Sequence, residues 1–132
     1  MVARPQVLSF GRMALIIHWF RAFVWTLAIE QVVAGWVLRR DIPAPRRIGL
    51  IAVCNVASHP AVWLIFPELG AALGWTHLGT LLVSEGWAFG LEALIYGLFL
   101  GPGYARKAVY ASTFANAVSL ALGFGLHALG WV

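Results

Sequence analysis

The sequence predicts an all-α fold, a polytopic transmembrane four-helix bundle with short connections. Hydrophobic residues make up 61% of the 132 residues and charged residues only 11%, whereas about a quarter of the residues of soluble domains are charged. Four long apolar stretches account for almost the whole chain, and short connections rich in charge, Pro or Gly separate them. We therefore expect an integral membrane protein surrounded by a lipid bilayer.

The first half of the chain contains two of the predicted spans. Residues 1–12 are expected to form an interfacial or disordered N-terminal tail, and the transmembrane domain is expected to cover residues 13–132. Its first helix is predicted at about 13–38 and its second at about 48–66. The connection between these helices is charged and contains two prolines, so we expect it to be stiff.

The second half contains the other two spans. A connection without Lys or Arg leads to a third helix at about 76–100, and a Gly-Pro-Gly turn leads to a fourth at about 108–127. Each predicted helix has about 19 or more residues, which is enough to cross a hydrocarbon core of about 30 Å. We see no convincing internal repeat in the sequence.

The charges predict how the helices are oriented. The net charge is +4, and six of the nine basic residues lie in two connections, the first with Arg39, Arg40, Arg46 and Arg47 and the second with Arg106 and Lys107. Short basic connections mark the cytoplasmic side of a membrane protein, so both termini are expected outside. A nucleic-acid partner is not expected, because the chain has no soluble module that carries a basic face.

Strongly polar residues occur at one depth in all four spans. Glu30, Asn55, Glu92 and Asn116 each lie seven or eight residues from the basic end of their predicted helix. At 1.5 Å per residue this places them about 11–12 Å from that edge. Intramembrane ionisable residues are costly and usually functional, so we interpret this layer as a candidate binding site.

Further polar residues share helix faces with this layer and complete the candidate site. Glu85 lies two turns from Glu92, Ser119 follows Asn116 by three residues, and His59 follows Asn55 by four. Carboxylate and amide oxygens suit Na⁺, Mg²⁺, Ca²⁺ or Mn²⁺, and His59 would add Zn²⁺. A proton relay through the carboxylates and His59 is the alternative.

The glycines predict close helix packing. Gly79, Gly86, Gly90 and Gly97 line one ridge of the third helix, and Gly123 lies on the fourth. Small residues let the backbones of transmembrane helices approach closely. The ridge is expected either to pack within the bundle or to contact a second copy or a partner membrane subunit.

Three histidines, His18, His77 and His127, fall near the outer interface, where they are weak candidates for metal ligands. A haem is not expected, because the paired histidines at matching depth that axial ligation requires are missing. Motifs of known catalytic sites are absent, and one cysteine cannot form an intramolecular disulfide.

Residues 25–126 resemble a group of small uncharacterised prokaryotic four-helix membrane proteins. The resemblance rests on the segments TLAIE, NVASHP, EGWAFGLEALIY and NAVSLALG. It implies a location in the prokaryotic inner (plasma) membrane, and it places the three glutamates and two asparagines of the candidate site in one pattern. Asn often stands in that group where His59 stands here, which weakens a metal site that depends on His59. The resemblance implies no activity.

The sequence leaves three functions open. The first is a buried carboxylate and amide site for a cation or protons, used in transport or ion-coupled binding, in a homo-oligomer or with partner subunits. The second is a non-catalytic subunit that scaffolds a membrane complex. The third, an intramembrane enzyme, has the least support, because it would have to use the glutamates and His59 as acid and base groups.

Overall fold

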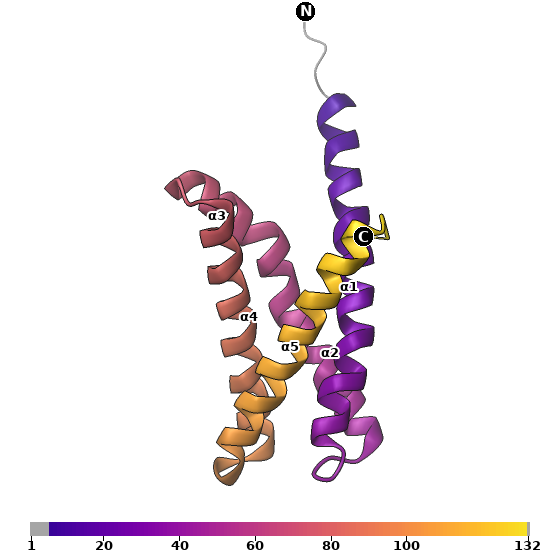
Figure 1. Ribbon diagram of the computed structural model, residues 1–132, viewed down its shortest axis with the longest axis vertical. Coiled ribbons are helices and arrows are strands. Elements are labelled where there is room, and N and C mark those ends of the chain that lie inside the picture. Colours follow the sequence, from indigo (N-terminus) through magenta and orange to yellow (C-terminus); the bar gives the residue numbers. More distant parts are fainter. Residues whose placement is uncertain (1–5, 132) are drawn as a thin grey trace, which may run out of the picture.

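Seven helical segments make up the described part of the chain, and Figure 1 shows their arrangement. The computed structural model describes residues 6–131, with side chains from residue 13 onward. In chain order the segments are α1 (Gln6–Leu38), α2 (Ala44–Pro60), the π-helix η1 (Ala61–Ile65), α3 (Phe66–Leu73), α4 (His77–Leu100), the 3₁₀ turn η2 (Pro102–Tyr104) and α5 (Ala105–Ala128). The described part contains no strand, and the predicted all-α class is confirmed.

Four of the helical stretches are long and apolar enough to span a membrane. They are Met13–Leu38, Ala44–Leu73, His77–Leu100 and Pro102–Ala128. Many large apolar side chains point outward, such as Val32 at 71% and Leu98 at 76% exposed, whereas Glu30 and Glu92 are 0% and 1% exposed. Apolar outside and polar inside is the arrangement that a lipid environment favours, so the chain is an integral membrane protein.

The second span extends beyond both of its predicted ends, and the first turns of its two α-helices, α2 and α3, each contain a proline. The second span begins at Ala44 rather than at residue 48, with Pro43 as its N-cap residue. It continues through η1 and α3 to Leu73, although we predicted a connection after residue 66. Proline is tolerated in a first turn, where its missing N–H would have had no helical partner. The first span also starts early, since α1 begins at Gln6, inside the predicted tail; residues 1–5 lie outside the described residues.

A tight turn joins α3 to α4. Gly74 ends α3 in the left-handed conformation, with φ of 67°, which glycine adopts without steric cost. The Oγ1 of Thr76 then accepts a hydrogen bond of 3.0 Å from the backbone N–H of Gly79 and caps α4. A Cβ at Gly70 would lie 2.2 Å from the Oγ1 of Thr80. Glycine at this position therefore lets α3 lie directly against α4.

The spans form a ring in the order α1, α2, α4, α5, in which each packs against the next. In Figure 1, α1 and α4 diverge toward the upper end, α5 crosses in front from the foot of α4 to the upper part of α1, and the α2–η1–α3 stretch crosses behind in the opposite sense. A half-turn about the long axis thus exchanges the hairpin α1–α2 with the hairpin α4–α5. This approximate twofold arrangement was not predicted from the sequence.

Close contacts inside the two hairpins obey the same twofold relation. If Glu30 is set against Glu92, Gly35 falls against Gly97. A Cβ at Gly35 would lie 3.7 Å from the Nε of Arg47 on α2, and a Cβ at Gly97 would lie 3.8 Å from the Cβ of Ala108 on α5. Equivalent glycines therefore face the neighbouring helix in both hairpins, near the same end of the bundle.

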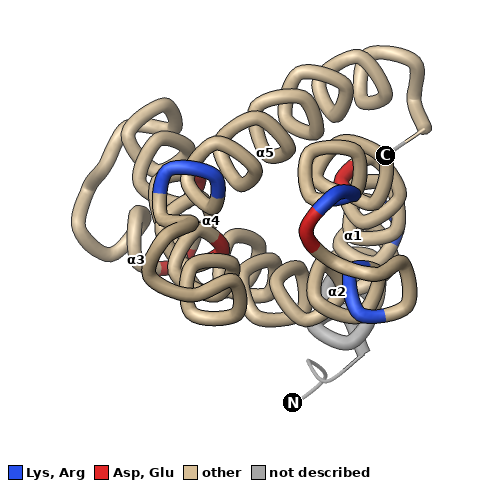
Figure 2. Tube along the Cα trace, turned by 90° about the horizontal axis from the view of Figure 1, so that it is seen from below, with Lys and Arg blue, Asp and Glu red and all other residues tan. Residues whose placement is uncertain are grey.

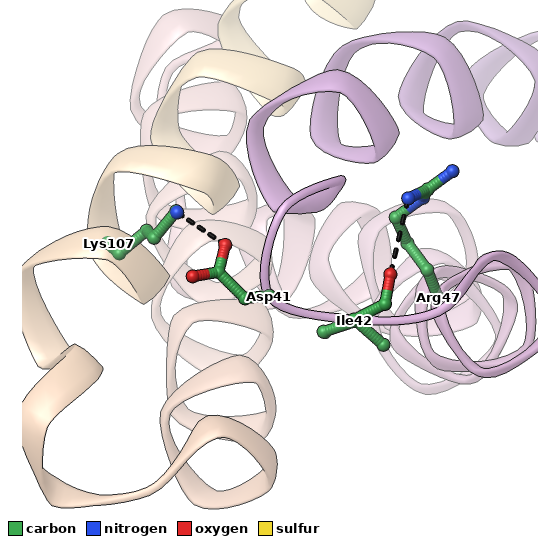
Figure 3. A network of polar contacts seen from close by, with 4 residues as sticks. All are labelled: Asp41, Ile42, Arg47 and Lys107. Atoms are coloured by element: carbon green, nitrogen blue, oxygen red, sulfur yellow. Dashed lines mark hydrogen bonds and ion pairs between the residues drawn. The ribbon is translucent and has the colours of Figure 1, made fainter.

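The basic connections lie together at that end. Figure 2, viewed from this end, shows Lys and Arg gathered at the α1–α2 and α4–α5 connections. Lys107 and Asp41 form an ion pair that joins the two connections, and the Nη1 of Arg47 donates a hydrogen bond of 3.3 Å to the carbonyl of Ile42 (Figure 3). Both connections are thereby held on one side of the bundle.

Candidate functional site

The first half of the candidate site joins α1 to α2. The Nδ2 of Asn55 donates hydrogen bonds to the Oε2 of Glu30, at 2.7 Å, and to the carbonyl of Ile51 in its own helix, at 3.1 Å. Asn55 is 1% exposed. The two hydrogen bonds hold the amide of Asn55 in one orientation. The amide therefore links the carboxylate of Glu30 on α1 to the backbone of α2.

The second half joins α4 to α5 in the same way. The Nδ2 of Asn116 donates hydrogen bonds to the Oε2 of Glu92, at 2.6 Å, and to the carbonyl of Ser112, at 3.1 Å. Ser112 itself donates to the carbonyl of Phe89 on α4, at 2.9 Å. Asn116 and Glu92 thus repeat the arrangement of Asn55 and Glu30.

Two serines connect the halves. The Oγ of Ser58 on α2 donates to the Oε1 of Glu92 at 2.7 Å, and the Oγ of Ser119 on α5 donates to the Oε1 of Glu30 at 3.3 Å. Each carboxylate oxygen therefore accepts one hydrogen bond, and through these four bonds the two carboxylates connect every neighbouring pair of spans. The four side chains that were predicted to share one depth do lie together, with Ser119 beside them.

This hydrogen-bond ring obeys the twofold relation. Exchange of the hairpins maps the Asn55–Glu30 bond onto the Asn116–Glu92 bond, and the Ser58–Glu92 bond onto the Ser119–Glu30 bond. The expectation that the chain has no internal repeat was therefore wrong, and the contact of Ser58 with Glu92 was not predicted. The motif Asn-x-x-Ser, which occurs in both the second and the fourth span, could have revealed the repeat. Asn55 lies 25 residues after Glu30, and Asn116 lies 24 residues after Glu92.

A cavity of about 450 Å³ opens onto this ring from the end of the bundle away from the basic connections. Glu30, Glu92 and Asn116 line its inner part. Glu85, two turns farther out along α4, lines its wall and makes no hydrogen bond within residues 13–131. The three glutamates of the prediction therefore face one cavity, and one of them remains accessible from it.

His59 also lines the cavity and is 7% exposed. Its ring lies among aromatic rings: the centroid of Phe23 is 5.4 Å away, and that of Trp63 is 6.2 Å away in a stacked orientation. The Nδ1 of His59 has no hydrogen-bond partner in the described part of the chain. Pro60 follows directly as the last residue of α2, and the π-helix turn η1 begins after it, beside the cavity.

Below the carboxylates the bundle is closed. Tyr96 lies one turn from Glu92 toward the basic end and is 0% exposed, as are Cys54 and Leu38. The phenol oxygen of Tyr96 and the Oδ1 of Asn55 have no hydrogen-bond partner among the described residues. The cavity is therefore open at one end of the bundle and sealed at the other by packed side chains.

The outer histidines do not form a cluster. His77 and His127 line the mouth of the cavity, whereas His18 is exposed on α1 and lies outside the cavity lining. Across residues 13–131, no three His, Cys, Asp or Glu side chains are arranged to hold a metal ion. Zn²⁺ bound through a histidine cluster thus has no support in this geometry, and oxygen ligands remain as the candidates for binding a cation.

The predicted packing glycines differ in their surroundings. Gly97 contacts α5, and Gly79 meets its own helix cap at Thr76. A Cβ at Gly86, Gly90 or Gly123 would have no neighbour within 4 Å. Gly123 borders the cavity, whereas Gly86 and Gly90 are exposed on the outside of α4, so these two do not pack within the described chain.

Chemically, the site offers several hard oxygen atoms in a small volume. Each carboxylate has about four lone-pair positions and uses two of them for the hydrogen bonds of the ring. The remaining positions on the carboxylates can accept a proton or ligate a cation, whereas the Oδ1 of Asn55, which has no hydrogen-bond partner among the described residues, can only ligate a cation. No protein-family model matches the chain, and neither a curated protein nor a solved structure matches it.

Proposed function

We propose that this membrane protein binds a cation or protons between Glu30 and Glu92, in transport or ion-coupled binding. The observation that supports the proposal best is the hydrogen-bond ring: four spans converge on two carboxylates that a cavity reaches from one side. In membrane proteins built from two repeats, binding sites commonly lie at the interface of the repeats near mid-membrane. Each of the two carboxylates accepts a hydrogen bond from the other hairpin, and this position between the hairpins supports the proposal.

Energetics favours an occupant of positive charge. A central Asp, Lys or Arg costs roughly 2.5–3.5 kcal/mol on insertion scales, and we expect Glu to be similar. Interhelical hydrogen bonds in membranes contribute on average about 0.6 kcal/mol each. Four such bonds would offset less than half of the cost of two ionised carboxylates. Protonation or a bound cation supplies the missing compensation, and it lets the occupancy of the site change.

We further propose that the cavity opens to the outside of a prokaryotic inner membrane. The basic connections lie at the sealed end of the bundle, and short basic connections stay in the cytoplasm. A single bundle that is sealed at one end does not provide a complete path across the membrane. Transport therefore requires a second conformation that opens the basic end, or additional subunits.

The test is thermal unfolding of the purified protein across Na⁺, Mg²⁺, Ca²⁺, Mn²⁺, Zn²⁺ and pH. We expect one cation to raise the unfolding temperature, and we expect this effect to decline as the pH is lowered, because protons compete for the carboxylates. Glu30→Gln and Glu92→Gln should remain folded and lose the effect to a similar degree, since the twofold relation makes the two carboxylates equivalent. Glu68→Gln, the same change on the exposed surface of α3, is the matched control.

Two results would contradict the proposal. An unfolding temperature that does not change with any of the five cations or with pH would show that the proposed binding site does not exist. An effect that survives in both Glu30→Gln and Glu92→Gln would place any bound ion elsewhere in the protein.

A structural subunit of a membrane complex is the second candidate. Gly86 and Gly90 lie exposed on α4 with open space around them, and small residues at this spacing suit close contact between transmembrane helices. This function requires co-purification with a defined partner that Gly90→Leu disrupts. Isolation of the native protein as a stable monomer would argue against it.

A further inference from the structure

The cavity is much larger than an inorganic ion requires. Its volume is about 450 Å³, which lies within the range of about 300–1,000 Å³ typical of sites for small organic molecules. Apolar side chains, among them Val62, Leu81 and Phe124, form most of its wall. A hydrated ion gains nothing from such a wall, whereas an apolar molecule does.

All the charged side chains of the cavity are acidic. Glu30, Glu85 and Glu92 line it, and its lining residues within 13–131 include neither Lys nor Arg. A ligand with a negative group would therefore be repelled, and a neutral apolar ligand would leave the accessible carboxylate of Glu85 without compensation. A positive group on the ligand satisfies both conditions.

Aromatic rings surround the same space. Trp25 and Trp63 line the cavity, and Trp63 stacks on His59. The face of a tryptophan ring attracts organic ammonium groups as well as apolar surface, and cages of this kind recognise ammonium ligands. The buried His59, with its unpartnered Nδ1, adds a polar group beside these rings.

The inner end of the cavity, its floor, follows the twofold relation more closely than its wall does. At the inner end, equivalent positions of the two hairpins carry the same residue type: glutamate, asparagine or serine. On the wall, equivalent positions carry different residue types. When the repeats are aligned on Glu30 with Glu92, Glu85 is equivalent to Phe23. When they are aligned on Asn55 with Asn116, His59 is equivalent to Leu120. Of these four side chains, Glu85, His59 and Leu120 line the cavity, so its wall differs between the two hairpins.

We propose that the cavity binds an organic amine, with its ammonium group at the glutamates and its apolar body between Trp25 and Trp63. This inference rests on the proposed cation site and names the class of its ligand. The ammonium takes the place of the inorganic cation or proton at the floor, and the apolar wall contributes affinity that an inorganic ion cannot obtain.

The experiment compares tryptamine with tryptophol, which has the same ring and chain length but a hydroxyl in place of the amine. Equilibrium binding of radiolabelled tryptamine to the full chain in nanodiscs at pH 7 is measured with each compound as competitor. We expect saturable binding and at least roughly tenfold weaker competition by tryptophol, a difference of about 1.4 kcal/mol. Glu92→Gln and Trp63→Leu should each weaken tryptamine binding, and Glu68→Gln should not.

Glu85→Gln provides a second variant that leaves the hydrogen-bond ring intact, so a loss of binding there cannot be attributed to misfolding of the floor. Equal competition by tryptophol, or tryptamine binding unchanged in both Glu85→Gln and Glu92→Gln, would overturn the inference. If tryptamine does not bind while the inorganic cation or pH effect persists, the ligand class is wrong and the cation site stands. If both effects are absent, the proposed function fails as well.

Discussion

Asn55 and Asn116 each donate a hydrogen bond to a buried glutamate on a neighbouring span. A carboxylate within a membrane needs donors, and a transmembrane helix has no backbone N–H to offer, because its own ladder uses them. Each asparagine directs one N–H to a carbonyl of its own helix and the other to a glutamate on the neighbouring span. The amide therefore couples the position of the carboxylate to the helix that carries the amide.

We predict a measurable coupling between Asn116 and Glu92. Asn116→Ala removes the donor at 2.6 Å and should lower the free energy of unfolding by about 0.6–1.7 kcal/mol, the range for interhelical hydrogen bonds in membranes. In a double-mutant cycle with Glu92→Gln, measured by reversible unfolding in mixed micelles, the coupling should reach at least about 0.5 kcal/mol.

The control cycle pairs Asn116→Ala with Glu68→Gln, which lies on the exposed surface of α3. Distant sites add within about 0.3–0.5 kcal/mol. A cycle with Glu92 that is equally additive would mean that this hydrogen bond contributes nothing to stability.

At the level of the helices, equivalent glycines on α1 and α4 face the neighbouring helix of the same hairpin. Gly35 faces α2 and Gly97 faces α5, each with less than 4 Å between a Cβ built on the glycine and a side-chain atom of the neighbouring helix. Beyond these contacts α1 and α4 diverge and leave room for the cavity (Figure 1). Close packing at one end and separation at the other are thus two aspects of one geometry.

A leucine at Gly97 should destabilise the protein, whereas a leucine at Gly86 should not. Ala108 lies in ordinary contact distance of a Cβ at Gly97, so a larger side chain would force α4 and α5 apart at a cost of about 1–3 kcal/mol. Gly86 has nothing within 4 Å and is the matched control on the same helix. Unfolding of both variants in detergent tests this; equal stability of the two would contradict the packing at Gly97. A loss of stability in Gly86→Leu alone would instead indicate a contact with another chain.

The whole molecule is asymmetric along its long axis. One end carries the basic connections, the Lys107–Asp41 ion pair and a sealed core, and the other carries the mouth of the cavity with His77 and His127. The ion pair holds the connections of both hairpins together (Figure 3). Because the two ends differ, the orientation of the protein in the membrane can be tested.

We predict that Ala72 lies outside the cell and Gly103 inside. Cys54 is the sole cysteine and is 0% exposed, so Cys54→Ser gives a background for single new cysteines. In intact cells a membrane-impermeant maleimide should label Ala72→Cys and should not label Gly103→Cys. Both should react after permeabilisation, and the reverse pattern in intact cells would invert the orientation of the cavity.

The sequence by itself determined the helical class, the number of spans, the gathering of the basic residues and the common depth of Glu30, Asn55, Glu92 and Asn116. These follow from hydropathy and helix rise, which are local and periodic. It misjudged where the second span begins and ends, near Pro45 and Pro67, because the effect of proline depends on whether it stands in a first turn or in the interior of a helix.

The twofold relation, the contact of Ser58 with Glu92 and the cavity were decided by the tertiary structure alone. Each depends on how the helices cross, and one sequence specifies crossing angles only through the packing of side chains that lie far apart in the chain. The repeated Asn-x-x-Ser motif was present in the sequence. The structure shows the role of this motif, because each serine donates a hydrogen bond to the glutamate of the other hairpin.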